Sequence, residues 1–184
     1  MGHSRDDKAR NHERIVQIAA GRMREAGTEG PSVAELMHAA GLTHGGFYKH
    51  FDSRDQLVAE AVAHAFAESE RAVADVTADQ ADPLGAFVDW YLSAQHRDNP
   101  GTGCGIVALG SDAARGGDAV QTAYREQVER YLAHLEELLG NRDNAAAALS
   151  QLVGAVHVAR AIGPGELSDR ILSDARASVV SYRA

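Results

Sequence analysis

The sequence predicts an all-α protein of about nine helices, in which a three-helix N-terminal module precedes a larger helical bundle. Three observations predict this class. Apolar residues recur at spacings of three and four along most of the chain, sustained strand-like alternation is absent, and only 5% of residues are aromatic while alanine is abundant. A chain of 184 residues accommodates one ordinary domain, or a small module joined to a larger one.

The first helix is expected over residues 6–26. Its apolar face carries Ile15, Ile18 and Met23 at helical spacing, and Gly27 follows as the C-terminal cap. The turn chemistry of "GTEGPS" then separates this helix from the next one.

Two short helices follow this turn. Ser32 and Glu35 form a capping-box pattern, which predicts a helix from residue 33 to about residue 40. Thr43 is expected to cap a second short helix that runs to about residue 50. Two short helices joined by a glycine-containing turn are the helix-turn-helix signature.

The rest of the chain also has helical periodicity. Ser53 and Gln56 repeat the capping pattern ahead of a long helix over about 54–78. Asp82 and Pro83 begin the next helix. The helices expected after residue 80 cover about 83–97, a short segment that ends near 115, and then 117–139, 143–162 and 166–182.

The charge of the chain is unevenly distributed. The net charge is −8, which by itself argues against binding to nucleic acid. Residues 1–54, however, carry eight Lys and Arg against seven Asp and Glu, together with five of the nine histidines. This asymmetry indicates a near-neutral module attached to an acidic body.

The segment "GLTHGGFYKHF" (41–51) combines two glycines with aromatic and basic side chains. Gly45 and Gly46 disfavour a helix by about 1 kcal/mol each, but they allow a backbone to come close to DNA. Phe47 and Phe51, four residues apart, are expected to pack inward. That leaves the intervening polar side chains and His44 facing outward, with donors for phosphates or base edges.

At this point a family resemblance becomes clear. The stretch "SVAELMHAAGLTHGGFYKHFDSRDQLVAEA" (32–61) resembles the DNA-binding module of the TetR/AcrR family of bacterial transcriptional repressors. The resemblance rests on Ala40–Gly41, on the "GGFYKHF" block, and on the "F-x-S-R/K-x-x-L" entry into the long helix, and it covers about fifty residues.

The resemblance implies roles for nine residues in binding double-stranded DNA. Four of them would face the DNA at the front of the recognition helix. The other five would contact phosphates, and for one of these five residues a base is the alternative target. The first group is Thr43, His44, Gly45 and Gly46; the second is Ser32, Tyr48, His50, Arg54 and Lys49, the last with phosphate or base as its target.

Alternatives remain at several of these positions. Tyr48 has packing as its alternative, although two phenylalanines already fill the inward positions. His44 and His50 have the alternative of being solvated surface groups. An N-terminal basic arm and a frayed, solvated end are equally consistent with the residues Arg5, Lys8 and Arg10.

The last two helices, about 143–162 and 166–182, are suited to pairing with a second chain. Small residues such as Gly154 and Ala161 alternate with large aliphatic ones in the first of them, so helices can approach closely. The resemblance implies a four-helix bundle between two chains, and hence a homodimer on a pseudo-palindromic operator with half-sites ~34 Å apart. The alternative is that both helices are ordinary core of a monomer.

The middle helices are expected to enclose a pocket for an unknown small-molecule inducer. The candidate lining residues that we single out are Trp90, Tyr91, Cys104, Tyr124 and His157, and further candidates are Phe87, His96, Tyr131 and His134. For each of them, ordinary core packing is the alternative. The spacing of these residues predicts no metal site and no cofactor.

Cys104, the single cysteine, lies between glycines just before a short helix. A helix N-terminus favours a reactive thiol, and the segment is similar to one in a TetR subgroup in which some members sense electrophiles or oxidants through cysteine. A small buried hydrophobic residue is the alternative. A thiol-dependent enzyme, or a protein-interaction module built around Cys104, is the alternative function, but no motif orients a histidine toward the thiol.

These observations predict a cytoplasmic protein with no secretion signal and no membrane span. Residues 1–53 would form the DNA-binding domain, and residues 54–184 the ligand-binding and dimerisation domain. The expected function is that of a non-enzymatic, ligand-responsive transcriptional regulator, a repressor that an inducer or modification of Cys104 releases from DNA.

Overall fold

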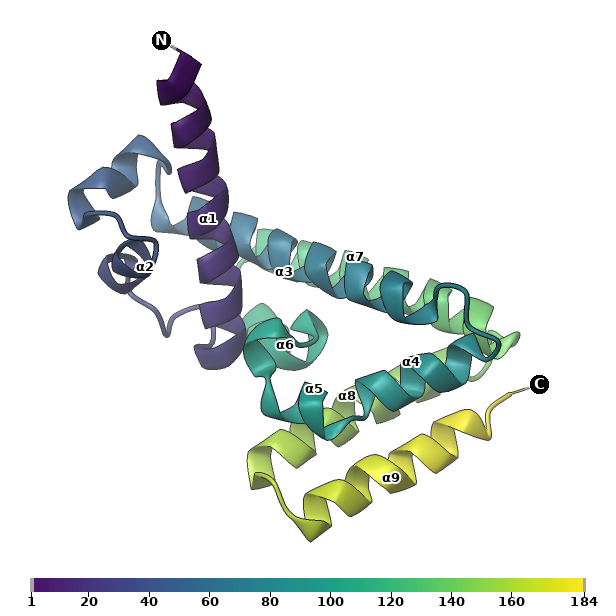
Figure 1. The fold of residues 1–184 in the computed structure, drawn as a ribbon. Coiled ribbons are helices and arrows are strands. Elements are labelled where there is room, and N and C mark those ends of the chain that lie inside the picture. Colours follow the sequence, from purple (N-terminus) through teal and green to yellow (C-terminus); the bar gives the residue numbers. More distant parts are fainter. Residues whose placement is uncertain (1, 184) are drawn as a thin grey trace.

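The computed structural model describes residues 2–183 and contains, over this range, nine α-helices, two 3-10 helices and no strand (Figure 1). The predicted all-α class is therefore confirmed. The elements are α1 (Gly2–Ala26), α2 (Val33–Ala39), η1 (His44–Lys49), α3 (Arg54–Thr77), α4 (Pro83–Tyr91), α5 (Ala94–Asp98), η2 (Pro100–Thr102), α6 (Gly105–Arg115), α7 (Asp118–Leu139), α8 (Ala145–Ile162) and α9 (Glu166–Val180).

Local signals set the ends of the first two helices. The chain leaves α1 at Gly27 and α2 at Gly41, whose φ angles of +79° and +68° fall in the region that favours glycine. The Ser32 hydroxyl accepts a hydrogen bond from the amide of Glu35 at 3.2 Å, and the Glu35 carboxylate accepts one from the amide of Ser32 at 2.8 Å. The predicted capping box is therefore present.

The segment expected to be a second short α-helix is instead a 3-10 helix, η1. Thr43 occupies its N-cap position but makes no side-chain hydrogen bond there, so the predicted Thr43 cap is wrong. Two consecutive glycines in six residues lower the α-helical propensity enough for the tighter form. The buried side chain of Phe47 then holds η1 against the module.

The long helix α3 packs in both halves of the molecule. Ser53 caps it, accepting a hydrogen bond from the Gln56 amide at 3.1 Å. Leu57 and Phe66 lie in one buried cluster with residues of α1, α2 and η1, whereas Val73 lies in a second cluster with residues of α4, α7, α8 and α9. A displacement of α3 therefore affects both cores.

The helix expected over 83–97 is divided into α4 and α5. Ser93 separates them, because its hydroxyl donates to the carbonyl of Trp90 at 2.7 Å and accepts from the amide of His96 at 3.1 Å. A serine that bonds to the local backbone in this way competes with the helical hydrogen bonds and restarts the helix.

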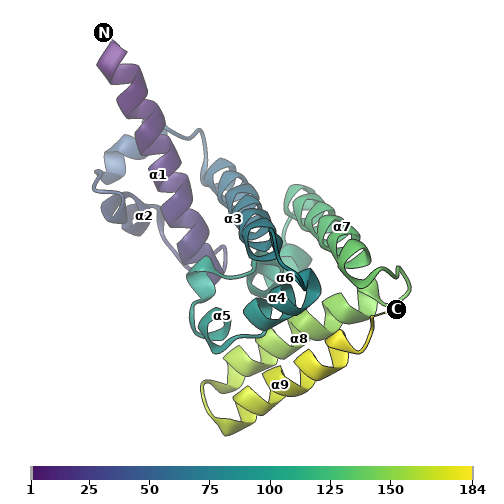
Figure 2. The ribbon, with the colours of Figure 1, turned by 45° about the vertical axis from the view of Figure 1, so that its right-hand side comes forward.

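The helices form a module and a bundle that meet at the C-terminal end of α1 (Figure 1). α2 and η1 lie against one side of α1, and α3 runs beside α7. α8 and α9 pair side by side at the far end of the bundle from the N-terminus (Figure 2). By its length and composition α8 could span a membrane, but a single helix of this kind is only a weak indication of a membrane protein. The inner face of α8 packs in the core, where Leu152 and Val156 are fully buried.

Candidate nucleic-acid interface and sensing core

The aromatic residues of the η1 segment divide into buried anchors and one exposed ring. Phe47 and Phe51 are 2% and 1% exposed, and their stacked rings lie 5.4 Å apart. His12 of α1 stacks on Phe51 at 4.5 Å, and its Nε2 lies 2.6 Å from the Glu60 carboxylate of α3. These contacts attach η1 to α1 and α3 and set which of its side chains face outward.

The outward face of η1 carries exposed hydrogen-bonding groups. Tyr48 is 75% exposed, and its ring packs edge-to-face with that of Phe47, with the centroids 5.3 Å apart. Thr43, His44 and Lys49 are also exposed. An aromatic hydroxyl beside an ammonium group and an imidazole makes a surface suited to phosphate oxygens and base edges.

Gly45 lies on the same exposed face, and nothing inside the protein requires a glycine there. A Cβ atom built on Gly45 meets no other atom within 4 Å, and the backbone is not in the left-handed region. A Cβ on Gly46 makes only ordinary contacts, at 3.6 Å from Met37. The bare backbone at Gly45 is therefore a surface against which a partner can come close.

Two of the nine predicted DNA contacts already have protein partners. The Arg54 guanidinium donates to the carbonyl of Thr28 at 2.6 Å and pairs with Glu29 at 3.0 Å. The Ser32 hydroxyl donates to Glu35 at 2.6 Å, and hydrogen bonds from Ser32 hold the pKa of this carboxyl below its ordinary value. A phosphate at Arg54 or Ser32 has to replace these bonds or share them.

A third predicted contact, His50, is only partly accessible. Its ring is half-buried beside His12 and Phe51, and its Nδ1 is buried without a hydrogen-bond partner. Burial lowers the pKa of His50, and the positive charges of His12, Lys8 and Lys49 lower it further. The neutral form of His50 is therefore favoured in the free protein.

The basic residues Arg5, Lys8 and Arg10, for which an arm and a frayed end were both open, lie on a regular helix. From Arg5 onward the chain is part of the regular helix α1, and Arg10 forms an ion pair with Asp7 one turn away. These side chains are exposed on a helix surface rather than carried on an irregular arm.

Hydrogen bonds of two side chains, Arg24 and Asp112, attach the end of α1 and the turn after it to the bundle. Arg24, 6% exposed, donates to the Gly101 carbonyl and to the Glu68 carboxylate, both at 2.7 Å. Asp112 of α6 accepts from the amide and the hydroxyl of Thr28 at 2.9 and 2.8 Å. The N-terminal module is therefore bonded to α3, η2 and α6.

Three of the five singled-out sensing candidates gather around His96. Cys104 is the N-cap residue of α6, is 1% exposed, and donates its backbone N–H to His96 Nε2 at 2.9 Å. Because Nε2 accepts this bond, the ring proton is on Nδ1, which donates to the Tyr91 carbonyl at 2.6 Å. Trp90 stacks on the His96 ring at 5.4 Å.

This arrangement does not form a thiol–imidazole pair. Both ring nitrogens of His96 bond to the backbone, and burial lowers the pKa of His96 to about 4. The imidazole therefore has no free nitrogen with which to take the Cys104 proton. Among the residues that the structure describes, no group of three or more metal-ligating side chains occurs.

The other two candidates lie apart from this cluster. Tyr124 donates its hydroxyl to the Ile106 carbonyl at 3.0 Å, so its hydrogen-bonding capacity is used within the protein. His157 is exposed on α8 and lines an outer groove together with Arg24 and Arg160.

Sequence reasoning named Tyr91 and Tyr131 as candidates, but it missed Ser69 and did not predict that these residues meet at the Cys104 thiol. The Tyr91 and Tyr131 hydroxyls lie next to it, and Ser69 of α3 is beside Tyr131. Neither tyrosine hydroxyl makes a hydrogen bond of normal geometry, and burial raises the pKa of both. Three of these residues lie on different helices, so no local pattern indicates that they meet.

The buried His96 predicts a pH dependence of stability. In the unfolded chain His96 takes up a proton as the pH falls below the ordinary histidine pKa of 6.5, whereas in the folded protein it does so only near pH 4. The free energy of unfolding therefore falls as the pH is lowered from 6.5 to 4. We expect His96 to contribute a loss of about 2 kcal/mol in the free energy of unfolding between pH 7.5 and 5. Urea unfolding of the wild type and a His96→Gln variant at both pH values measures it. Equal losses in the two proteins would contradict this assignment.

The N-terminal module matches a known family. Residues 15–61 match the family described as bacterial regulatory proteins, tetR family. No curated protein matches the chain significantly by sequence.

Solved structures match over nearly the whole chain. A TetR transcriptional regulator from Chloroflexus aurantiacus J-10-FL is 22% identical, with a TM-score of 0.83 and 96% of each chain covered. A TetR-family regulator from Cytophaga hutchinsonii is 17% identical, with a TM-score of 0.82 over 95% of this chain and 96% of that one. The reduced form of Escherichia coli NemR is 18% identical, with a TM-score of 0.79 over 93% of this chain and 95% of that one. At these identities the likeness shows a shared fold.

Proposed function

We propose that the protein is a cytoplasmic, homodimeric repressor, because residues 15–61 match the tetR family of bacterial regulatory proteins and the chain shares its fold with solved TetR-family regulators. It binds a pseudo-palindromic operator, and a small-molecule inducer or modification of Cys104 releases it. Residues 1–53 contact the DNA, and residues 54–184 bind the ligand and the second chain.

The observation that carries the proposal is the division of η1 into a buried and an exposed face. Phe47 holds the segment in place while Tyr48, Lys49 and the bare backbone of Gly45 face outward. In the proposed complex Tyr48 and Lys49 donate to phosphates, and Thr43 and His44 approach the base edges. Gly46, His50, Arg54 and Ser32 are secondary contacts, since each is half-buried or already hydrogen-bonded.

Gly45 provides a direct test of this orientation. A Gly45→Ala variant should lower operator affinity about tenfold, because the added methyl group occupies the space that the DNA backbone or a base edge needs. Its free energy of unfolding should not fall, since the Cβ meets open space. Fluorescence anisotropy and urea unfolding measure the two quantities.

Gly117 is the matched control, because a Cβ there also meets open space and the residue lies at the start of α7. Gly117→Ala should bind DNA as the wild type does. Unchanged affinity of Gly45→Ala would show that η1 does not present this face to DNA.

The proposed dimer forms through the outer faces of α8 and α9. Val158, Ile162 and Leu167 are 44%, 47% and 53% exposed, and they are large apolar side chains on adjacent ends of the two helices. Nearby, Gly154 and Ala161 leave room for close helix contact. Pairing with the same surface of a second chain would bury these side chains and place two η1 segments on one operator.

The proposed release acts through α3 and α6. α3 begins at Arg54, five residues after η1 ends, and packs in both cores. α6 begins next to Cys104 and carries Asp112, which bonds Thr28 of the N-terminal module. A ligand or adduct that displaces either helix changes the separation of the two recognition segments in the dimer.

An adduct on Cys104 would have large structural consequences. The thiol is 1% exposed and lies beside the hydroxyls of Tyr91 and Tyr131. Any group added to Sγ has to displace Tyr91 or Tyr131, or to move α6, whose N-cap residue is Cys104, since protein interiors hold few voids. This supports Cys104 as a second route to release.

A further inference from the structure

The turn between α1 and α2 holds the side chain of Arg54, the first residue of α3. The Arg54 guanidinium donates to the Thr28 carbonyl at 2.6 Å and to the Glu29 carboxylate at 3.0 Å. The Arg54 side chain is 30% exposed, whereas that of Glu29 is 87% exposed. A carboxylate at the protein surface therefore lies directly against a cation that the proposed function assigns to a DNA phosphate.

This turn is itself bonded to the rest of the protein. The Thr28 amide and hydroxyl both donate to the Asp112 carboxylate of α6, at 2.9 and 2.8 Å. The Gly30 amide donates to the Gly27 carbonyl at 3.2 Å, which closes the turn. Because Glu29 lies between these bonded residues, its backbone is fixed beside Arg54, and only the rotation of its side chain moves the carboxylate away.

The two acceptors of Arg54 differ in charge. The Thr28 carbonyl is neutral, so it orients the guanidinium without opposing a negative ligand. The Glu29 carboxylate carries the same sign of charge as a phosphate and accepts from the same kind of N–H donor. A guanidinium has five N–H donors, so a phosphate can bind to those that remain while Thr28 keeps its bond.

Glu29 opposes a phosphate at Arg54 in two ways. It competes for the N–H donors, and it repels a phosphate bound to the remaining donors, which would lie two hydrogen bonds of ~3 Å from the carboxylate. Both effects are independent of the base sequence, because every nucleotide carries a phosphate. Each effect is modest, since ion pairs at the protein surface contribute little.

We propose that Glu29 is a determinant of DNA affinity, a carboxylate that competes with the DNA backbone for Arg54 and weakens binding to every sequence. This inference rests on the proposed function, because it requires that Arg54 contacts a phosphate. In the free protein Glu29 balances the charge of Arg54 while Thr28 keeps the guanidinium in position. DNA then has to displace one carboxylate to complete its contacts.

A Glu29→Gln variant tests this role, because it keeps the size of the side chain and removes its charge. The variant should bind the operator and an unrelated duplex of the same length about fivefold more tightly than the wild type does at ~0.1 M salt. Fluorescence anisotropy measures both affinities. Since Glu29 is 87% exposed, the variant should fold as the wild type does, which urea unfolding would show.

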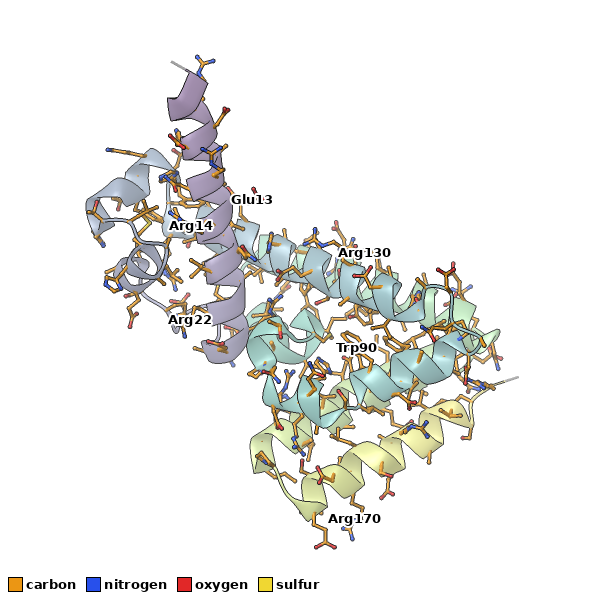
Figure 3. All side chains as sticks on the ribbon, viewed as in Figure 1. Glu13, Arg14, Arg22, Trp90, Arg130 and Arg170 are labelled. Atoms are coloured by element: carbon orange, nitrogen blue, oxygen red, sulfur yellow. The ribbon has the colours of Figure 1, made fainter. Side chains whose placement is uncertain are left out.

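A double-mutant cycle separates competition for Arg54 from a general loss of negative charge. In an Arg54→Ala background, Glu29→Gln should change the affinity by less than about twofold, since the cation for which Glu29 competes is gone. Glu25→Gln is the matched control. Glu25 pairs with Arg22 at 3.2 Å, and Figure 3 shows Arg22 near the C-terminal end of α1, outside the proposed DNA contacts. This control should also change the affinity by less than about twofold.

The outcomes distinguish this proposal from the function on which it rests. Unchanged affinity of Glu29→Gln for both duplexes overturns the proposal, and so does a fivefold gain that persists in the Arg54→Ala background. If the wild type binds both duplexes equally while Glu29→Gln gains affinity only when Arg54 is present, the repressor proposal fails and the role of Glu29 is supported. Absence of binding to either duplex overturns both.

Discussion

We expect a Tyr48→Ala, Lys49→Ala double variant to bind operator DNA about 30- to 1,000-fold more weakly than the wild type, because each lost contact to a charged phosphate is worth ~1–2 kcal/mol. Its free energy of unfolding should be unchanged, since Tyr48 is 75% exposed and Lys49 is exposed as well. The slope of log affinity against log salt should fall by about 0.9, the contribution of one cation–phosphate contact.

Fluorescence anisotropy across a salt series measures the affinity and the slope. Arg125→Ala removes a positive charge from the exposed surface of α7 and is the control for a general effect of charge. The double variant would contradict the interface if it kept wild-type affinity, or if it lost affinity together with its cooperative unfolding transition.

The second large effect is expected at the proposed dimer surface. An Ile162→Asp, Leu167→Asp variant places two carboxylates where a second chain would bury two apolar side chains, and it should be a monomer. Since a dimer gains ~100- to 10,000-fold in affinity from engaging both half-sites, the variant should lose about that factor on the operator.

Light scattering after size exclusion gives the mass, and anisotropy gives the affinity. Both side chains are about half exposed in the single chain, so its helical content should be retained, as circular dichroism would show. A wild type that is already monomeric, or a monomeric variant with full operator affinity, would rule out this surface as the functional interface.

The elements with local causes were predictable from the sequence. The Ser32–Glu35 capping box and the stop at Gly41 depend on residues within a few positions of each other, and the structure contains both. The inward packing of Phe47 and Phe51 follows from their spacing of four in the same way. This is why the N-terminal module could be outlined from its residues alone.

The features that depend on distant contacts were not predictable in this way. Arg54 has the sequence context of a DNA contact, but its partners are Thr28 and Glu29, about 25 positions away. The grouping of Ser69, Cys104 and Tyr131 joins α3, α6 and α7, which only tertiary packing brings together.

The break between α4 and α5 was missed for a different reason. Ser93 lies within a run of helical periodicity. A serine in such a run can continue the helix, or its hydroxyl can bond to nearby backbone groups in place of the helical hydrogen bonds, as it does here. The sequence does not show which set of bonds is the more stable, because that depends on the packing of Trp90 and His96 on either side of it.

The measurement that tests the central claim most directly is the binding of the purified wild-type protein to duplex DNA from the region around its own gene, followed by fluorescence anisotropy over a salt series. The account predicts binding by two chains per duplex, a steep loss of affinity with salt, and much weaker binding to an unrelated duplex of the same length. Weak binding of equal strength to both duplexes, with the Tyr48→Ala, Lys49→Ala variant indistinguishable from the wild type, would contradict it.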